Sequence, residues 1–109
     1  MIAEISQRPH VQFKEHQLGP HHPQSIALGE LTPSPIAQRR FVPSWASQLA
    51  SIFDLDAMQR ITVNLRDSTY YIVNGQHTVA ALRILGFSPT DVVPCEVYKG
   101  LTEKQEAFL

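Results

Sequence analysis

A chain of 109 residues with 43% hydrophobic residues is long enough for one domain with a modest core. Its net charge of −1 lacks the basic excess that is typical of a dedicated nucleic-acid-binding protein. No apolar run approaches the roughly 20 residues that span a membrane, the N-terminus has no signal-peptide pattern, and one cysteine excludes an internal disulfide. We therefore expect a protein of a reducing compartment, by default the cytoplasm, with no membrane partner.

The first 24 residues are polar and show no sustained periodicity, which predicts a loosely ordered N-terminal arm with one short strand near residues 11–13. We expect the domain itself to occupy residues 25–109. The arm contains four histidines without the paired Cys/His spacing of a zinc site, so we interpret it as solvated and predict no metal site. These histidines are His10, His16, His21 and His22.

Hydrophobic periodicity and turn residues give the elements of the first half of the domain. Residues 25–31 are a candidate strand, and Pro33 and Pro35 are then expected to exclude regular structure. Pro43 favours the start of a helix, followed by a turn or a short helical turn at residues 54–58. The residues expected to face inward are Ile26, Leu28 and Leu31 on the strand and Trp45, Leu49, Ile52 and Phe53 on the helix.

The second half alternates strands and helices. Residues 60–65 and 70–73 are predicted strands joined by a hairpin turn, and a helix is expected over residues 76–85, with Gly86 just beyond its end. Residues 92–97 form a further candidate strand that buries Cys95. A capping box of Thr102 and Gln105 starts a last helix. This order predicts an α+β fold with a small mixed sheet and packed helices.

The junction of the second hairpin strand with the following helix is the candidate site. The strand stops at Asn74 and Gly75, and the polar pair Gln76 and His77 opens the helix. Helix N-termini present free backbone N–H groups that suit phosphates and other anions. Gly75 allows close approach because it has no Cβ. The alternative is that Asn74 and Gly75 form only a tight turn.

The stretch from Tyr70 to Gly86 resembles the signature of the ParB/sulfiredoxin superfamily, in which a Gly-x-His-Arg or Gly-Glu-Arg-Arg turn joins a strand to a helix. Residues 31–40 are similar to the superfamily's Asn-Pro-x-Gln-x-Arg segment, and residues 93–98 resemble its "vPv" strand. The resemblance extends from about residue 25 to the C-terminus. It implies a ParB/sulfiredoxin-like fold, here of phage, plasmid or mobile-element type.

Relatives that bind a nucleotide hold its phosphates at this turn and helix start. The nucleotide is CTP in the segregation proteins and ATP in sulfiredoxin-like members, and the resemblance implies the same use of the turn here. Thr78 and Ala80 stand where relatives carry arginines, and no cysteine lies in the turn, which argues against sulfinic acid reductase chemistry. The identity of the ligand stays open: the resemblance implies a nucleotide with Mg²⁺ or the phosphates of a nucleic acid. The implied binding residues are Gln38, Arg39, Arg40, Asn74, Gly75, Gln76, His77 and Thr78.

Several side chains of this region have two interpretations. His77 is either a general acid/base or an anchor of the turn that bonds a backbone carbonyl. Arg39 and Arg40 either contribute to the pocket or form an exposed basic loop. An aromatic set is either a base-stacking platform or, as we expect, part of the core. This set is Trp45, Tyr70 and Tyr71.

The function predicted first is a ParB-like nucleotide- or nucleic-acid-binding domain of a DNA-transaction or defence system. The first alternative is a degenerate enzyme-like domain that serves as a protein-interaction module, and the second is a nuclease or phosphotransferase, so enzymatic activity stays open. Because no helix-turn-helix segment follows within these residues, we expect no sequence-specific DNA binding by this chain alone. Phe108 and Leu109 are expected to pack on the domain's own core, on a partner or in a homodimer through the C-terminal helix.

Overall fold

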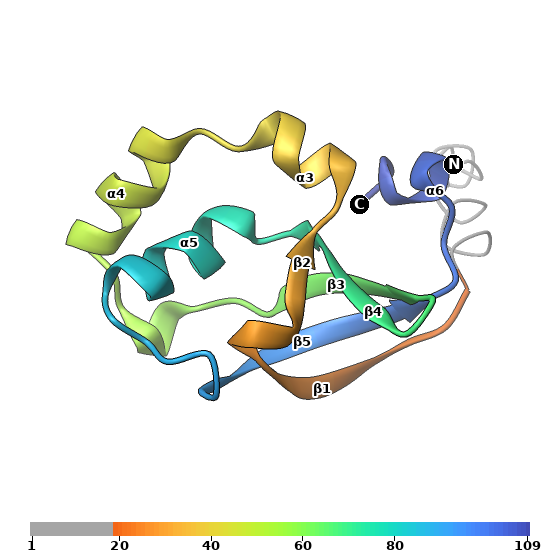
Figure 1. The fold of residues 1–109 in the computed structure, drawn as a ribbon, viewed down its shortest axis with the longest axis horizontal. Coiled ribbons are helices and arrows are strands. Elements are labelled where there is room, and N and C mark those ends of the chain that lie inside the picture. Colours follow the sequence, from red (N-terminus) through yellow and green to blue (C-terminus); the bar gives the residue numbers. More distant parts are fainter. Residues whose placement is uncertain (1–18) are drawn as a thin grey trace, which may run out of the picture.

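The computed structural model describes residues 19–109, which form one five-stranded mixed sheet with four α-helices and two 3₁₀ turns (Figure 1). The predicted α+β class with a small mixed sheet is confirmed. The strands are β1 (His21–Ala27), β2 (Leu31–Pro33), β3 (Ile61–Arg66), β4 (Thr69–Asn74) and β5 (Val92–Lys99). The helical elements are η1 (Leu28–Glu30), α3 (Pro35–Arg40), α4 (Pro43–Ser51), η2 (Leu55–Ala57), α5 (Gln76–Ile84) and α6 (Glu103–Glu106).

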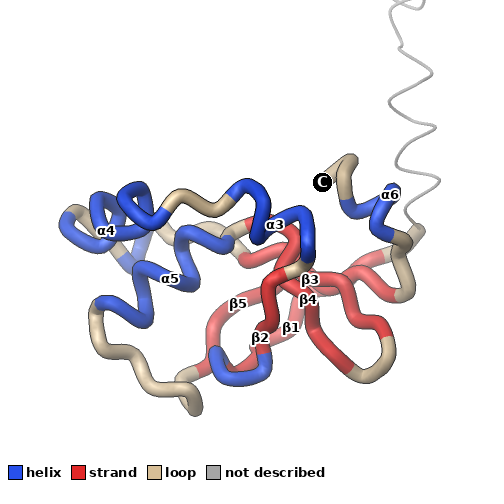
Figure 2. Tube along the Cα trace, turned by 45° about the horizontal axis from the view of Figure 1, so that its top comes forward, coloured by secondary structure: helices blue, strands red, loops and turns tan. Residues whose placement is uncertain are grey.

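The sheet order is β1-β5-β3-β4-β2, with β5 and β3 parallel, β4 and β2 parallel, and the other two pairs antiparallel. Asp67 and Ser68 turn the β3–β4 hairpin with positive φ angles of 51° and 64°, which matches the twist of the strands. The edge strand β2 runs beside β4 and leads directly into α3. This pairing brings α3 next to the β4–α5 junction. Figure 2 shows α4 and α5 together at one end of the sheet and α6 at the other.

The N-terminal part of the domain differs from the prediction. β1 begins at His21, inside the segment predicted as an arm, and ends at Ala27. The single strand predicted over residues 25–31 is wrong, because η1 separates β1 from β2. His21 bonds Glu96 on β5 and His22 bonds Gln24, so both belong to the sheet. His10, His16 and the strand predicted at residues 11–13 lie outside the described residues.

The segment after Pro33 is helical, which corrects the prediction of irregular structure. The Ser34 hydroxyl accepts a hydrogen bond from the Ala37 N–H at 3.1 Å and caps α3. Pro35 occupies the first helical position, where its missing N–H costs no helix bond and its fixed φ suits the helix. A proline breaks a helix when it lies in the interior, whereas Pro35 starts this one.

The predicted inward face of α4 and the residues after it is only partly correct, because Leu49 and Phe53 are half-buried, with Phe53 packed against the core, whereas Trp45 and Ile52 are exposed. The helix buries Ala46 and Ala50, while Trp45 is 58% exposed and Ile52 is 77% exposed. α4 packs against α5, and small side chains let two helices approach closely. Periodicity of hydrophobic residues overlooks a contact face made of alanines. The turn predicted at residues 54–58 is present as η2.

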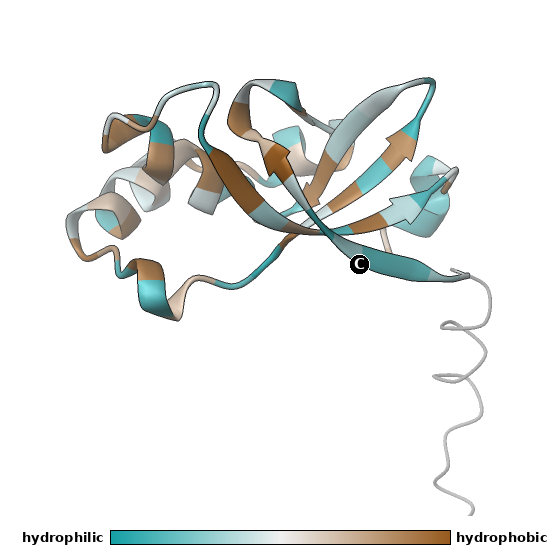
Figure 3. Cartoon of the chain, turned by 90° about the horizontal axis from the view of Figure 1, so that it is seen from below, coloured by the Kyte–Doolittle hydropathy of each residue, from teal (hydrophilic) through white to brown (hydrophobic). Residues whose placement is uncertain are grey.

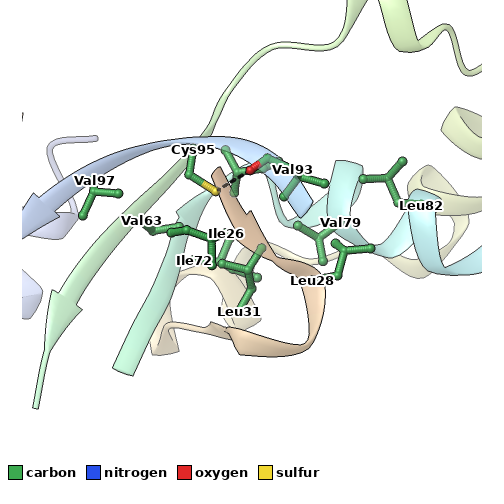
Figure 4. Close-up of a cluster of buried hydrophobic side chains, with 11 residues drawn as sticks. Ile26, Leu28, Leu31, Val63, Ile72, Val79, Leu82, Val93, Cys95 and Val97 are labelled. Atoms are coloured by element: carbon green, nitrogen blue, oxygen red, sulfur yellow. Dashed lines mark hydrogen bonds between the residues drawn. The ribbon is translucent and has the colours of Figure 1, made fainter. Parts of the chain in front are cut away.

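The core lies between the sheet and α5 (Figure 4). Along the strands, hydrophobic segments alternate with hydrophilic ones (Figure 3), as expected for strands with one buried face. Cys95 is fully buried, as predicted, and its Sγ lies 3.6 Å from the Val93 carbonyl oxygen. The core cluster consists of Ile26, Leu28, Leu31, Ile61, Val63, Ile72, Val79, Leu82, Val93, Cys95 and Val97.

The predicted capping box is present, and α6 is held to its own domain by a buried polar group. Thr102 and Gln105 cap each other's backbone N–H groups. Glu106 is 0% exposed and accepts a hydrogen bond from the buried amide of Asn64 at 2.6 Å. Phe108 is 45% exposed and Leu109 is half-buried. The homodimer or partner contact through this helix stays a prediction.

Candidate ligand-binding site

Gly75 forms the turn between β4 and α5 in the left-handed conformation, with φ +102°. Its carbonyl oxygen accepts the Val79 N–H at 3.0 Å, so Gly75 is the N-cap of α5. A glycine offers no side-chain acceptor, and the N–H groups of the first turn therefore stay available to a ligand. A Cβ at this position would lie 3.1 Å from Ile61 Cδ1, so the close packing of the turn on β3 also requires glycine.

A cavity of about 320 Å³ opens between α3, β4 and α5, beside this turn. Its walls are mostly apolar, with three polar side chains at Gln38, Gln76 and Arg83. Gln76 Oε1 is buried and has no hydrogen-bond partner among the described residues, so it can accept a hydrogen bond from a ligand. The lining residues are Pro33, Ala37, Gln38, Phe41, Ile72, Gln76, Val79, Ala80 and Arg83.

The cavity contains some of the predicted site residues and not others. Gln38 and Gln76 line it, whereas the exposed Arg39 and Arg40 are not among its lining residues. Thr78 lines a second cavity of about 310 Å³, formed with residues of α4 and η2. Asn74 is exposed at the end of β4. The cavity therefore does not gather all the residues predicted to bind phosphate, and their phosphate-binding role stays a prediction.

Sequence reasoning missed Arg83, which lines the cavity from the last turn of α5 and donates from Nη2 to the Leu28 carbonyl oxygen at 3.1 Å. A signal was present in the spacing. The lining residues of α5 are Gln76, Val79, Ala80 and Arg83, which follow the i, i+3, i+4, i+7 pattern of one helix face.

His77 anchors the start of α4. Its Nε2 accepts a hydrogen bond from the Val42 N–H at 3.0 Å, so Nε2 carries no proton in this arrangement. Its ring stacks on Phe41 at 5.1 Å and lies 5.4 Å from the tilted ring of Trp45. The bonded group is a backbone N–H and not the predicted carbonyl. Because a general acid/base role would compete with this bond, the geometry favours positioning, and the catalytic role of His77 stays a prediction.

The aromatic residues predicted to be core are only partly so. Trp45 is 58% exposed, which corrects the prediction for this residue. Tyr70 and Tyr71 are half-buried on β4, and the Arg66 guanidinium lies 4.1 Å above the Tyr71 ring. Among residues 19–109, no three His, Cys, Asp or Glu side chains lie together as a metal site would require.

Cys95 belongs to the core cluster and is not among the residues that line the cavity. Burial raises the pKa of its thiol from 9.0 to about 11, while the nearby Arg60 acts in the opposite direction. A thiol of this kind is protonated at neutral pH and is a poor nucleophile. The chain therefore has no candidate for thiol chemistry at the cavity.

The raised pKa of Cys95 predicts an alkaline loss of stability. The unfolded thiol ionises from pH 9.0 upward while the folded thiol keeps its proton, so stability is full below pH 9 and decreases up to about pH 11. Denaturant titrations at pH 8 and pH 11 should show a loss about 2 kcal/mol larger in the natural chain than in Cys95→Ala. Equal losses in the two proteins would contradict the assignment.

The fold is the one that sulfiredoxin and ParB N-terminal domains share, as the resemblance implied. Residues 32–109 match the family of unknown function DUF6551, and the chain belongs to this family. Comparison with curated protein sequences gives no match.

Three solved structures share the fold. Sulfiredoxin from Arabidopsis thaliana is 22% identical with a TM-score of 0.57, over 78% of this chain and 93% of that chain. The chromosome-partitioning protein ParB from Caulobacter crescentus, complexed with CTP-gamma-S, is 21% identical with a TM-score of 0.59, over 77% of this chain and 47% of that one. A Pnob8-like ParB-N domain is 14% identical with a TM-score of 0.57, over 81% and 32%. The chain thus spans about half or less of either ParB chain.

Within residues 19–109, none of the helices combines the length and the apolar character that crossing a membrane would need.

Proposed function

We propose that this chain is a nucleotide-binding domain whose ligand occupies the cavity between α3 and α5. The observation that carries the proposal is the position of this cavity. It is lined by Gln76, the residue after the glycine turn, so one ligand can reach the start of α5 and a mostly apolar wall. A nucleotide combines an anionic phosphate group with a planar base, and these two surfaces match those two parts.

The side chains of the cavity support this assignment. Gln76 Oε1 can accept a hydrogen bond from an amino or imino group of a base, and Phe41 and Ile72 offer apolar contact. The solved ParB from Caulobacter crescentus, which shares this fold, was complexed with the nucleotide analogue CTP-gamma-S. Mg²⁺ would accompany the phosphates as their counter-ion.

The charge of the site favours binding over catalysis. Ala80 lines the cavity where many superfamily members are expected to carry arginine, and Arg83 is engaged with the Leu28 carbonyl oxygen. Because the residues that line the cavity offer no free guanidinium, phosphate contacts there depend mainly on backbone N–H groups. These groups are weaker partners than the paired N–H donors of an arginine. We propose a binding domain within a DNA-transaction or defence system of phage, plasmid or mobile-element type. The chromosome-partitioning ParB among the fold neighbours supports the DNA-transaction part of this proposal.

A thermal-shift and calorimetry panel with CTP, ATP, GTP and UTP, each with Mg²⁺, tests the proposal. A ligand of the native state at a hundredfold excess over Kd stabilises it by about 2.7 kcal/mol. We expect at least one nucleotide to stabilise the natural chain. Ala80→Leu, which extends a side chain into the cavity, should abolish the effect.

Ala107→Leu is the matched control, because it places the same substitution at an exposed alanine after α6. It should bind as the natural chain does. A panel without any shift, or a shift that Ala80→Leu leaves unchanged, would overturn the proposal and favour the protein-interaction module. Turnover of the bound nucleotide would instead favour the nuclease or phosphotransferase alternative.

A further inference from the structure

Trp45 is the single tryptophan of the chain and is 58% exposed on α4. Its ring lies 5.4 Å from the His77 ring, which in turn stacks on Phe41 at 5.1 Å. The Val42 N–H donates a hydrogen bond to His77 Nε2 at 3.0 Å, so the imidazole ring beside Trp45 is held in place. The core does not explain this residue, because more than half of its surface is open to solvent.

Two exposed arginines precede Trp45 closely in the chain. Residues 35–51, which span α3 and α4, include Arg39 and Arg40 and contain no aspartate or glutamate. Both arginines are exposed at the end of α3, and neither has an ion-pair partner among the described residues. In a chain with a net charge of −1, this is a locally basic segment. We call the surface formed by Arg39, Arg40 and Trp45 the α3–α4 face.

We propose that the α3–α4 face binds single-stranded nucleic acid, with a base stacked on the open side of Trp45 and adjacent phosphates held by Arg39 and Arg40. Aromatic rings accept any base on their faces, and arginines pair with phosphates regardless of sequence, so this surface reads no sequence. In a duplex the bases are stacked on one another, so no base is free to stack on Trp45. The site is separate from the cavity, because none of these three residues is among those that line it.

Tryptophan fluorescence tests this directly, because the only indole of the chain reports from the proposed site. The probes are a twelve-residue oligo(dT), an oligo(U) of equal length and a duplex of equal length. We expect saturable quenching by at least one single-stranded probe and much weaker quenching by the duplex. Quenching by either the DNA or the RNA strand supports the proposal. The preference between oligo(dT) and oligo(U) shows which of the two nucleic acids the face binds better.

Charge and stacking are separated by two variants, measured by the anisotropy of a labelled oligonucleotide. Arg39→Gln with Arg40→Gln should reduce the slope of log K against log salt by about 1.4, at about 0.7 for each phosphate contact to a single strand. Trp45→Ala should weaken binding by about fivefold to a hundredfold. Circular dichroism melts establish that both variants are folded, and the arginine pair, being exposed, tests the proposal even if Trp45→Ala unfolds.

Lys104→Gln and Ile52→Ala are the matched controls, since they remove an exposed charge on α6 and an exposed apolar side chain after α4. They should bind as the natural chain does, and so should the cavity variant Ala80→Leu. Absence of binding, or equal binding by the natural chain and the face variants, would overturn the proposal. The natural chain could instead sediment as a dimer that Trp45→Ala converts to a monomer, and bind no oligonucleotide. That result would assign the face to contact with a second copy of the chain. Loss of oligonucleotide binding in Ala80→Leu would assign it to the cavity.

Discussion

Replacing Asn64 with alanine should destabilise the domain by about 3–5 kcal/mol. Asn64 is 0% exposed on β3, and its Nδ2 donates to the Leu101 carbonyl oxygen at 2.9 Å and to Glu106 Oε2 at 2.6 Å. Its Oδ1 accepts the Leu101 N–H at 3.0 Å. The substitution leaves three buried groups without this partner, and each such group costs about 1–3 kcal/mol. Urea denaturation measures the loss.

Asn74→Ala is the control for this measurement, because Asn74 is exposed at the end of the neighbouring strand and its replacement should cost under about 0.5 kcal/mol. A double-mutant cycle of Asn64→Ala with Glu106→Ala should be strongly non-additive, since the two side chains share one hydrogen bond. A loss below about 1 kcal/mol in Asn64→Ala, or additive effects, would contradict the view that this network fastens α6 to the domain.

Gly75→Ala should destabilise the domain by about 2–3 kcal/mol. The left-handed backbone conformation, at φ +102°, costs an L residue about 1–2 kcal/mol. The added Cβ would also lie 3.1 Å from Ile61 Cδ1, so the Ile61 side chain must move slightly. Because Gly75 begins α5, the variant should also weaken nucleotide binding more than its stability loss alone implies.

Gly86→Ala separates the two causes, because Gly86 has φ +94° and a Cβ added there would meet no atom within 4 Å. This control measures backbone strain alone. Ile61→Val removes the Cδ1 atom, so Gly75→Ala should cost less in that background than in the natural chain. If Gly75→Ala is no more destabilising than Gly86→Ala, packing of the turn on β3 plays no part.

The elements predicted well from the sequence are those whose signals are local. The β3–β4 hairpin and α5 follow from turn residues and a helical apolar pattern that stand next to each other in the chain. The capping box at Thr102 and Gln105 is predictable for the same reason. The sequence also identifies Gly75 as the turn, and the structure adds the contact with Ile61, which is distant in sequence.

The failures involve tertiary contacts. The inward face predicted for α4 and the residues after it is wrong for Trp45 and Ile52, which are exposed, because α4 packs on α5 and buries the small Ala46 and Ala50 instead. In the site, Gln38 lines the cavity but Arg39 and Arg40 do not, because successive residues of a helix point about 100° apart. Position in the sequence alone therefore does not show which residues of α3 line the cavity: Ala37 and Gln38 do, and Arg39 and Arg40 do not.

Amide NMR of the ¹⁵N-labelled chain during a titration with CTP and Mg²⁺ tests the nucleotide site most directly, because it locates the ligand residue by residue. We predict that the largest shift changes occur at the turn and along the cavity, at Gly75, Gln76, His77, Phe41 and Arg83. Ala80→Leu should remove them. Shift changes confined to the second cavity beside η2 or to α6, or changes that persist in Ala80→Leu, would contradict the account.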